Sequence, residues 1–257
     1  MNILEKICEI KFEEVKKLKK KNSFDNSMKP IKSFFLEKLK KKNNSNFNII
    51  AEVKKKSPSK GLLCNDFDPV KISKAYQKAG VDCLSILTDK KFFGGEISYI
   101  SKIKKKVNLP ILRKDFIIDE FQIYESHFFK VDCILLIFSI LTDKQISNFY
   151  NLAKSLGMDV ICEIHDESEL KRAIRLDVEC IGINNRNLKT LEVDIKNFIE
   201  LSQQIPKNVF KICESGISNN SQLFELTKYG ADAFLIGENL MKSENIYEAT
   251  IEMIKKR

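Results

Sequence analysis

The chain contains no tryptophan, only two histidines, and no cysteines spaced as Cys-x-x-Cys. His127 and His165 belong to no Cys/His cluster, so the sequence predicts no zinc site or other bound metal. Its seven cysteines are scattered and odd in number, which favours reduced thiols over a disulfide framework. The cysteines therefore indicate a cytoplasmic protein.

Long apolar runs are also missing. The longest, around residues 133–141, is far short of the roughly 20 residues that span a bilayer. The first residues carry no apolar segment of the kind that directs export. No Gly/Pro/Ser-rich linker divides the 257 residues, so we expect one structural unit that neither enters a membrane nor leaves the cell.

The net charge of +9 comes mostly from lysine, in runs such as 16–21, 40–42 and 104–106. A surface that binds single-stranded nucleic acid interleaves aromatic side chains with its basic ones, and these runs carry none. We therefore expect a solvated surface and no nucleic-acid partner. Part of the charge is expected to attract an anionic substrate.

Eight short apolar runs recur, and a stretch of helical pattern follows each. The runs are residues 48–53, 83–87, 109–113, 132–138, 160–164, 180–184, 210–213 and 234–237. The helical stretches are 69–79, 96–107, 120–129, 142–156, 167–176, 194–204, 219–229 and 244–256. Strands alternating with helices are typical of a parallel sheet, and eight such units predict a (β/α)8 TIM barrel over residues 47–257.

The first 46 residues have a different pattern. Apolar residues at near-helical spacing predict an amphipathic helix over residues 2–21, and a shorter helix is expected over 31–40. Residues 1–46 are therefore predicted to form an N-terminal helical extension packed ahead of the barrel.

Polar residues stand at the ends of several predicted strands, where such barrels hold their active sites. They are Glu52, Lys54, Lys114, Glu163, Asn184 and Glu214. Side chains at i and i+2 share a face of a strand, so Glu52 and Lys54 both point into the barrel mouth. Burying charges in one layer is costly unless the site uses them. Lysines and glutamates close together shift each other's pKa values, which lets an acid and a base coexist near neutral pH.

Glycines and aromatic residues mark two further parts of the predicted site. Gly216 and Gly237 follow strands seven and eight, where backbone N–H groups of such barrels hold phosphate. Phe93 and Phe116 follow strands two and three. At the rim of a polar pocket they are placed to sandwich an aromatic ring, with ordinary packing as the alternative.

In order and spacing, several motifs between residues 49 and 241 resemble those of the indole-3-glycerol phosphate synthase family. They are residues 50–59, 84–88, 92–95, 110–116, 163–166, 182–188, 214–217 and 234–237. The resemblance implies conversion of 1-(2-carboxyphenylamino)-1-deoxyribulose 5-phosphate to indole-3-glycerol phosphate, with loss of carbon dioxide and water, in tryptophan biosynthesis. It implies a phosphorylated small-molecule substrate and no cofactor, and it leaves association with other enzymes of the pathway open.

The resemblance also implies roles for individual residues. Lys114 matches the general acid that protonates the ketone oxygen, and Glu163 matches the base of the final dehydration. Lys54 matches the cation that holds the substrate carboxylate, with proton donation as a second role. Residues that orient these groups are Glu52, Asn184 and Glu214. The phosphate end and a second anion contact comprise Ser57, Ser215, Gly216, Gly237, the backbone N–H of Glu238, and Arg186. The pocket for the aromatic ring comprises Pro58, Phe93, Phe116, Leu135, Leu188 and Leu235.

One departure and two alternatives remain. Residues 129–131, Phe-Lys-Val, stand where the family usually has Gly-Ala before strand four, at the end of the barrel that carries stability. A sugar-phosphate isomerase is the nearer alternative, but such enzymes typically pair Cys or Asp with Asp at strands one and five or six. A non-catalytic basic barrel is the other, and it leaves the inward charges unexplained.

Overall fold

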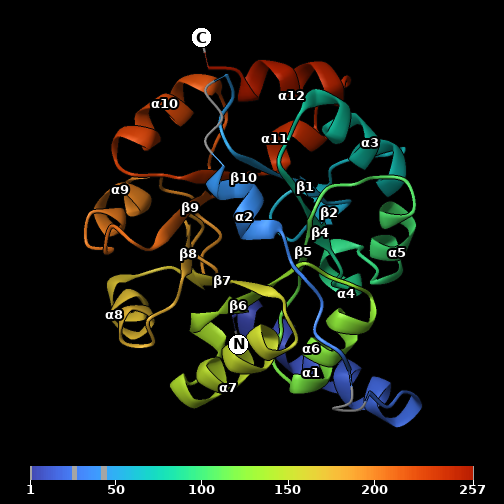
Figure 1. Ribbon diagram of the computed structural model, residues 1–257. Helices are drawn as coiled ribbons and strands as arrows, with labels where there is room; N and C mark the ends of the chain where they lie inside the picture. Colours follow the sequence, from blue (N-terminus) through green and yellow to red (C-terminus); the bar gives the residue numbers. More distant parts are fainter. Residues whose placement is uncertain (1, 25–27, 42–44, 257) are drawn as a thin grey trace.

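The computed structural model describes residues 2–24, 28–41 and 45–256. Parallel strands close into a barrel in the order β1-β10-β9-β8-β7-β6-β5-β4 (Figure 1). They are β1 (Ile49–Val53), β4 (Cys83–Leu87), β5 (Ile111–Lys114), β6 (Cys133–Ile137), β7 (Asp159–Ile164), β8 (Cys180–Asn184), β9 (Phe210–Glu214) and β10 (Ala233–Ile236). The predicted (β/α)8 barrel is confirmed.

Helices ring the barrel where the sequence predicts them. They are α3 (Pro69–Ala79), α5 (Ser98–Lys104), α6 (Glu120–Phe128), α7 (Asp143–Ser155), α8 (Glu167–Arg175), α9 (Lys196–Ser202), α10 (Asn220–Lys228) and α12 (Ile246–Ile254). Local signals set their ends. In α3 the Asp68 side chain accepts from the backbone N–H groups of Val70 and Lys71, and Gly80 ends the helix at φ 92°.

Short elements in the loops were not predicted. They are the hairpin β2 (Lys56–Ser57) and β3 (Gly61–Leu62), the helices α4 (Lys90–Phe93) and α11 (Glu238–Met241), and the 3-10 turn η1 (Phe138–Ile140). Elements of two to four residues are too short for a periodic pattern to appear in the sequence.

Two apolar layers result from the alternation of side chains along the strands. The outer layer lies between strands and helices, and the inner layer fills the barrel. The helix α2 (Phe35–Lys40) lies across the N-terminal end of the barrel (Figure 1). Its side chains of Phe35, Leu36 and Leu39 are buried against the inner layer. The strand cysteines are buried, as the sequence predicts, and Cys83 contacts the Phe35 carbonyl of this helix.

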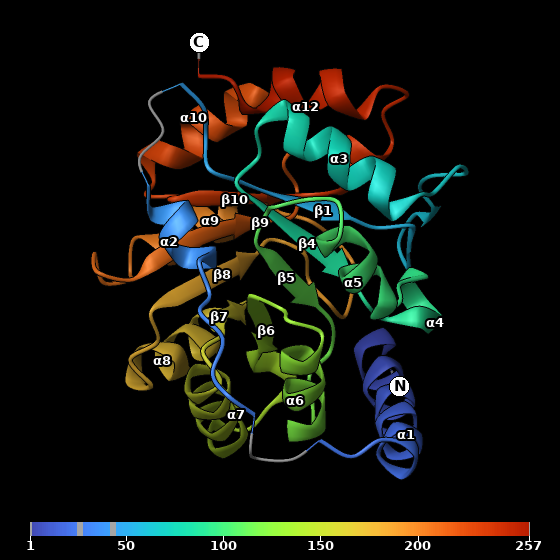
Figure 2. The ribbon, with the colours of Figure 1, turned by 45° about the vertical axis from the view of Figure 1, so that its right-hand side comes forward.

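The N-terminal extension reaches both ends of the barrel. Helix α1 (Ile3–Lys21) lies near α4 and α6, away from α2 (Figure 2). The chain then runs along the barrel, where Ile31 N–H donates to the Leu156 carbonyl at 3.0 Å. A Cβ at Gly157 would lie 1.9 Å from the Ile31 carbonyl oxygen, so this crossing requires glycine. Residues 1, 25–27, 42–44 and 257 lie outside the described residues.

Left-handed backbone ends several helices. After α7 and α10 the position is filled by Gly157 and Gly230, as the sequence predicts. After α6 it is filled by Lys130 at φ 56° and after α8 by Asp177 at φ 50°. Lys130 therefore adopts a conformation in which its Cβ is unfavourable.

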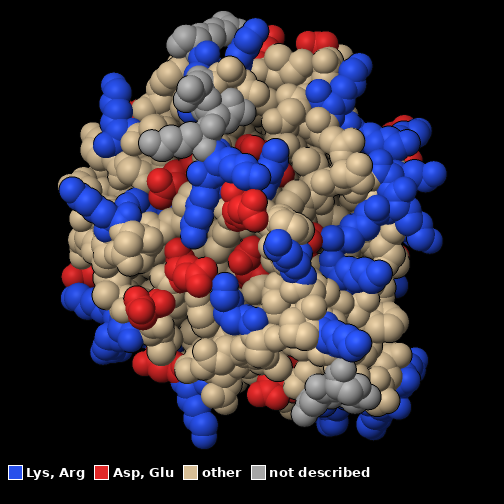
Figure 3. All heavy atoms as spheres, in the orientation of Figure 1, with Lys and Arg blue, Asp and Glu red and all other residues tan. Residues whose placement is uncertain are grey.

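Lys and Arg side chains occur around the whole face shown in Figure 3 and gather along its right-hand edge, while Asp and Glu lie mostly nearer its centre. Among the described residues, no helix combines the length and apolarity needed to cross a membrane.

Candidate active site

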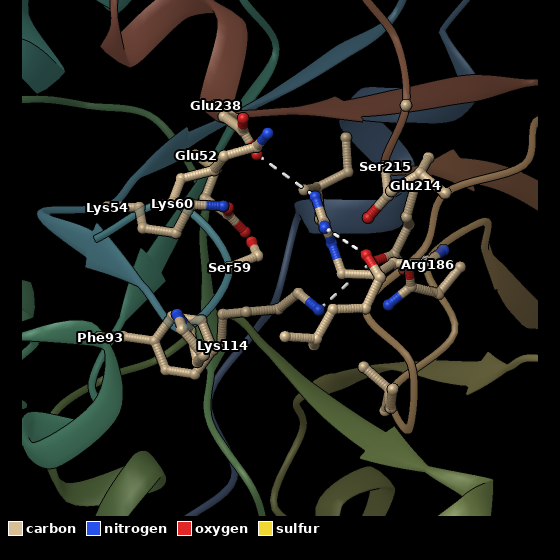
Figure 4. Close-up of a pocket in the computed structure, with 18 of the residues that line it drawn as sticks. Glu52, Lys54, Ser59, Lys60, Phe93, Lys114, Arg186, Glu214, Ser215 and Glu238 are labelled. Carbon is tan, nitrogen blue, oxygen red and sulfur yellow. Dashed lines mark hydrogen bonds and ion pairs between the residues drawn. The ribbon is translucent and has the colours of Figure 1, made fainter. Parts of the chain in front are cut away.

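A cavity of about 830 Å³ opens at the carboxyl ends of the barrel strands. It is lined by every candidate site residue except Ser57. Figure 4 labels Glu52, Lys54, Lys114 and Glu214 among them. Ser57 lines a smaller adjoining cavity of about 70 Å³, and its Oγ accepts from the Lys60 backbone N–H at 3.3 Å. Ser59 and Lys60 face the main cavity in its place, because the β2–β3 hairpin turns Ser57 toward its own loop. The role of Ser57 at the phosphate end stays a prediction, and Arg186 and Glu238 line the same small cavity.

Lys114 lies at the centre of the cavity's charges. Its Nζ is 2.6 Å from Glu163 Oε2 and 3.3 Å from Glu214 Oε2. Burial alone would lower the pKa of Lys114, but the charges of Glu163, Glu214 and Glu52 outweigh it and raise that pKa above its usual range. Lys114 is therefore held as an ammonium.

Glu163 and Glu214 share this lysine, but their pKa values are driven apart. Burial raises the pKa of Glu163, yet Lys114 and His165 outweigh it and keep that pKa below its usual range. Burial dominates at Glu214 and raises its pKa to about 7, and its second oxygen has no hydrogen-bond partner among the described residues. The site thus pairs a charged carboxylate with one that takes up a proton near neutral pH.

The absence of a side chain at Gly182 makes room for the carboxyl group of Glu214. A Cβ at position 182 on β8 would lie 2.1 Å from Glu214 Oε1. The missing side chain lets the carboxyl group from β9 lean across β8 toward Lys114.

His165 joins the site from the end of β7, and the sequence reasoning missed it by weighing it only as a zinc ligand. Its Nε2 is 3.2 Å from Glu163 Oε1, and its Nδ1 is 3.1 Å from Glu169 Oε2. Burial lowers the pKa of His165, but the close carboxylate of Glu163 and the hydrogen bond to Glu169 outweigh it and raise that pKa to about 9. The spacing was a usable signal, since residues i and i+2 share a face and Glu169 lies in the first turn of α8.

Glu52 and Lys54 share a face at the end of β1, as predicted. Lys54 Nζ is 2.6 Å from Glu52 Oε1, and Ser85 Oγ lies 3.4 Å from the other carboxylate oxygen. A Cβ at Gly237 would lie 2.8 Å from Glu52 Cβ, so the glycine after β10 also makes room for Glu52.

Backbone turns and a pair of cations lie at the end of the cavity beyond β9 and β10. Ser215 and Gly216 adopt positive φ values of 66° and 83°. Glu238 starts α11, and its carboxylate lies 3.3 Å from Arg186 Nη2 and 2.7 Å from Lys242 Nζ. The Glu238 carboxylate would repel a bound anion, but it is paired with two cations. The backbone N–H of Glu238, at the start of α11, is the donor that an anion can use.

The aromatic wall differs from the sandwich expected from the sequence. The ring centroids of Phe93 and Phe116 are 6.1 Å apart, a distance at which two rings pack directly against each other. They form one side of the cavity, with Leu135, Leu188 and Leu235 as further apolar lining.

Comparison with known proteins identifies the family. The family model described as "Indole-3-glycerol phosphate synthase" matches residues 4–253. The chain belongs to this family. An indole-3-glycerol phosphate synthase of Campylobacter fetus subsp. fetus is 48% identical over 215 residues, covering 84% of this chain and 83% of that protein. One of Caldanaerobacter subterraneus subsp. tengcongensis is 45% identical over 243 residues, covering 94% of each chain.

Solved structures of low identity agree on the fold. A 3-hexulose-6-phosphate synthase superimposes with a TM-score of 0.63 at 14% identity, covering 80% of this chain and 98% of that chain.

The match of residues 4–253 to indole-3-glycerol phosphate synthase confirms the resemblance seen in the sequence and sets aside the isomerase and the non-catalytic barrel. The match also takes in α1 and α2, so the extension is part of the family's pattern.

Proposed function

We propose that the chain converts 1-(2-carboxyphenylamino)-1-deoxyribulose 5-phosphate to indole-3-glycerol phosphate, releasing carbon dioxide and water. The observation that carries the proposal is the Lys114 ammonium, held between Glu163 and Glu214 in a cavity that has an apolar wall and an anion-binding end. The substrate has the same three parts, an aromatic ring, a reacting centre and a phosphate. The cavity of about 830 Å³ lies within the usual range for small-molecule sites.

Lys114 acts as the general acid of ring closure. As the aromatic carbon attacks the ketone, negative charge develops on the ketone oxygen, and a buried ammonium stabilises that charge and gives it a proton. The carboxylates around Lys114 keep it protonated until the substrate arrives. An alkoxide is a stronger base than an amine, so the proton transfer runs downhill.

Glu163 acts as the base of the last step. After closure, the bond to the substrate carboxylate breaks, carbon dioxide leaves, and the electron pair of that bond returns to the ring system. Loss of the hydroxyl as water then moves two protons. The Lys54 ammonium gives one to the leaving oxygen, and Glu163, the carboxylate that stays charged, takes one from the neighbouring carbon. Asn184 and Glu214 orient the substrate hydroxyls and Lys114 from neighbouring strands.

The two ends of the substrate are held by different groups. Lys54 pairs with the substrate carboxylate while Glu52 tempers its charge. The backbone N–H groups of residues 215–216 and 237–238 bind the phosphate, with Arg186 as a nearby cation. Ser57 contributes to the phosphate end from the adjoining small cavity, which Arg186 and Glu238 also line.

The direct test is the formation of indole-3-glycerol phosphate by the purified protein with no added cofactor or metal. We expect indole-type fluorescence to appear with saturation kinetics, and inorganic phosphate to compete with the substrate. A folded protein that gives no product under these conditions would overturn the proposal.

We further propose a cytoplasmic location, supported by seven cysteines that are all free thiols.

Association with other enzymes of tryptophan biosynthesis stays a prediction. Co-purification of a pathway enzyme at stoichiometric amount with the tagged protein would support it, and elution of the chain alone would count against it.

A further inference from the structure

Helix α1 places a buried lysine beside the active site. The Lys11 side chain is 2% exposed, and its Nζ lies 2.9 Å from Asp115 Oδ1, 3.0 Å from Asp89 Oδ2 and 3.1 Å from Glu14 Oε2. Burial lowers the pKa of Lys11, but these three carboxylates outweigh it and raise that pKa above its usual range. Removing the ammonium would take a charge partner from the buried carboxylates of Asp89 and Asp115, so Lys11 holds these two groups in place.

Asp115 connects Lys11 to the strand that carries the general acid. It directly follows Lys114, and its Oδ1 also accepts from the backbone N–H of Phe116 at 2.8 Å. Its Oδ2 accepts from Thr88 Oγ1 at 2.5 Å and lies 3.3 Å from Arg113 Nη2. The backbone between Lys114 and Phe116 is therefore held by a carboxylate that Lys11 holds in turn.

Asp89 connects Lys11 to the other aromatic residue of the wall. It is the N-cap of α4, and its Oδ1 accepts from the backbone N–H groups of Phe92 and Phe93 at 2.7 and 3.3 Å. Its Oδ2 is the oxygen that faces Lys11. One ammonium thus ties together the two loops that present Phe93 and Phe116.

The same contact docks the first turns of α1 over the apolar end of the site. Ile3, Leu4 and Ile7 line the small cavity of about 70 Å³ together with Phe93 and Phe116. Figure 2 shows α1 beside α4 and α6.

We propose that Lys11 is a positioning residue that holds Phe93, Phe116 and the first turns of α1 in the arrangement that receives the aromatic ring of the substrate. Lys11 does not touch the substrate and acts through Asp89 and Asp115. The inference rests on the proposed function, since it assigns the apolar end of that site to the ring.

The test is Lys11→Met, which keeps most of the side chain's length and removes its ammonium. We expect KM for the substrate to rise about tenfold or more, because small misplacements of binding groups are costly, while kcat falls less than about threefold. Inhibition by inorganic phosphate, which binds the far end of the site, should be unchanged. Lys11→Arg should restore part of the KM loss.

Lys19→Met is the matched control. Lys19 lies on the same helix and pairs with Asp119, the N-cap of α6, at 3.0 Å, but its side chain is 51% exposed. It should behave as wild type. If Lys11→Met does not fold, Asp89→Asn tests the same contact, because the amide oxygen still caps α4 while the charge facing Lys11 is lost; it too should raise KM.

Unchanged KM in folded Lys11→Met, or in Asp89→Asn where that variant replaces it, would overturn the inference, as would an equal weakening of phosphate inhibition. Either result in an active wild type would leave the proposed function standing. An inactive wild type would overturn the proposed function and this inference together.

Discussion

Lys114 Nζ and Glu163 Oε2 lie 2.6 Å apart, although they come from strands that are not neighbours in the barrel. The proposed acid and the proposed base thus hold each other ionised before the substrate binds. The ketone oxygen of the substrate must displace Glu163 from Lys114. Substrate binding therefore frees Lys114 to act as the acid and Glu163 to act as the base at the same time. A (β/α)8 barrel allows this because the ends of all its strands face one cavity.

The first prediction concerns the acid. Lys114→Ala should lower kcat by about 10²–10⁴, the usual cost of losing a positioned proton donor. The variant should remain folded, because Glu214 has a pKa of about 7 and can take a proton when its cation is removed. Circular dichroism and the product assay measure the two effects. A folded variant that keeps more than about a tenth of the wild-type kcat would assign the acid elsewhere.

The second prediction concerns pH and His165. Its folded pKa of about 9 lies above the ordinary value of 6.5, so its contribution to stability is complete below pH 6.5 and is lost as the pH rises through 9. Wild type should therefore exceed His165→Gln in the free energy of unfolding by about 3 kcal/mol at pH 6, at about 1.4 kcal/mol for each pKa unit.

Urea titrations of both proteins between pH 6 and 9.5 check this. The gap between them should shrink steadily over that range. A gap independent of pH would mean that His165 packs against Glu163 and Glu169 without binding an additional proton on folding.

Much of the fold follows from the sequence. Eight buried runs, each followed by an amphipathic stretch, leave few arrangements other than a closed barrel, and Asp68, Pro69 and Gly80 mark the ends of α3 to the residue. The convergence of Glu52, Lys54 and Lys114 follows as well, because strand ends meet in this fold.

What the sequence did not predict depends on contacts between distant segments. Lys11 is one lysine among many in a charged helix, and only the docking of α1 buries it against Asp89 and Asp115. The deciding contact is tertiary.

The third prediction concerns stability alone. Lys130 occupies a left-handed position after α6 that glycine fills after other helices. Lys130→Gly should raise the free energy of unfolding by about 0.5–1 kcal/mol, because it relieves an unfavourable Cβ position at some cost in chain entropy. Lys74→Gly, within α3, is the control and should lower it by about 1 kcal/mol. Chemical denaturation compares the two. Lys130→Gly should leave kcat unchanged, and a loss of stability would show that the lysine side chain contributes more than its backbone costs.

The last prediction separates two kinds of work by the pair at the end of β1. The substrate brings a carboxylate that must be placed before it leaves as carbon dioxide, and a strong cation would oppose departure by stabilising the charge that departs. The Glu52 carboxylate, 2.6 Å from the Lys54 ammonium, weakens the attraction between Lys54 and the substrate carboxylate. Lys54 should therefore contribute mainly by orienting that carboxylate. Lys54→Met should therefore weaken binding and turnover together. It should weaken affinity for indole-3-glycerol phosphate, which lacks the carboxylate, much less than affinity for the substrate. Titration of the folded variant with both ligands measures the difference, and equal losses would show that Lys54 does not recognise the carboxylate.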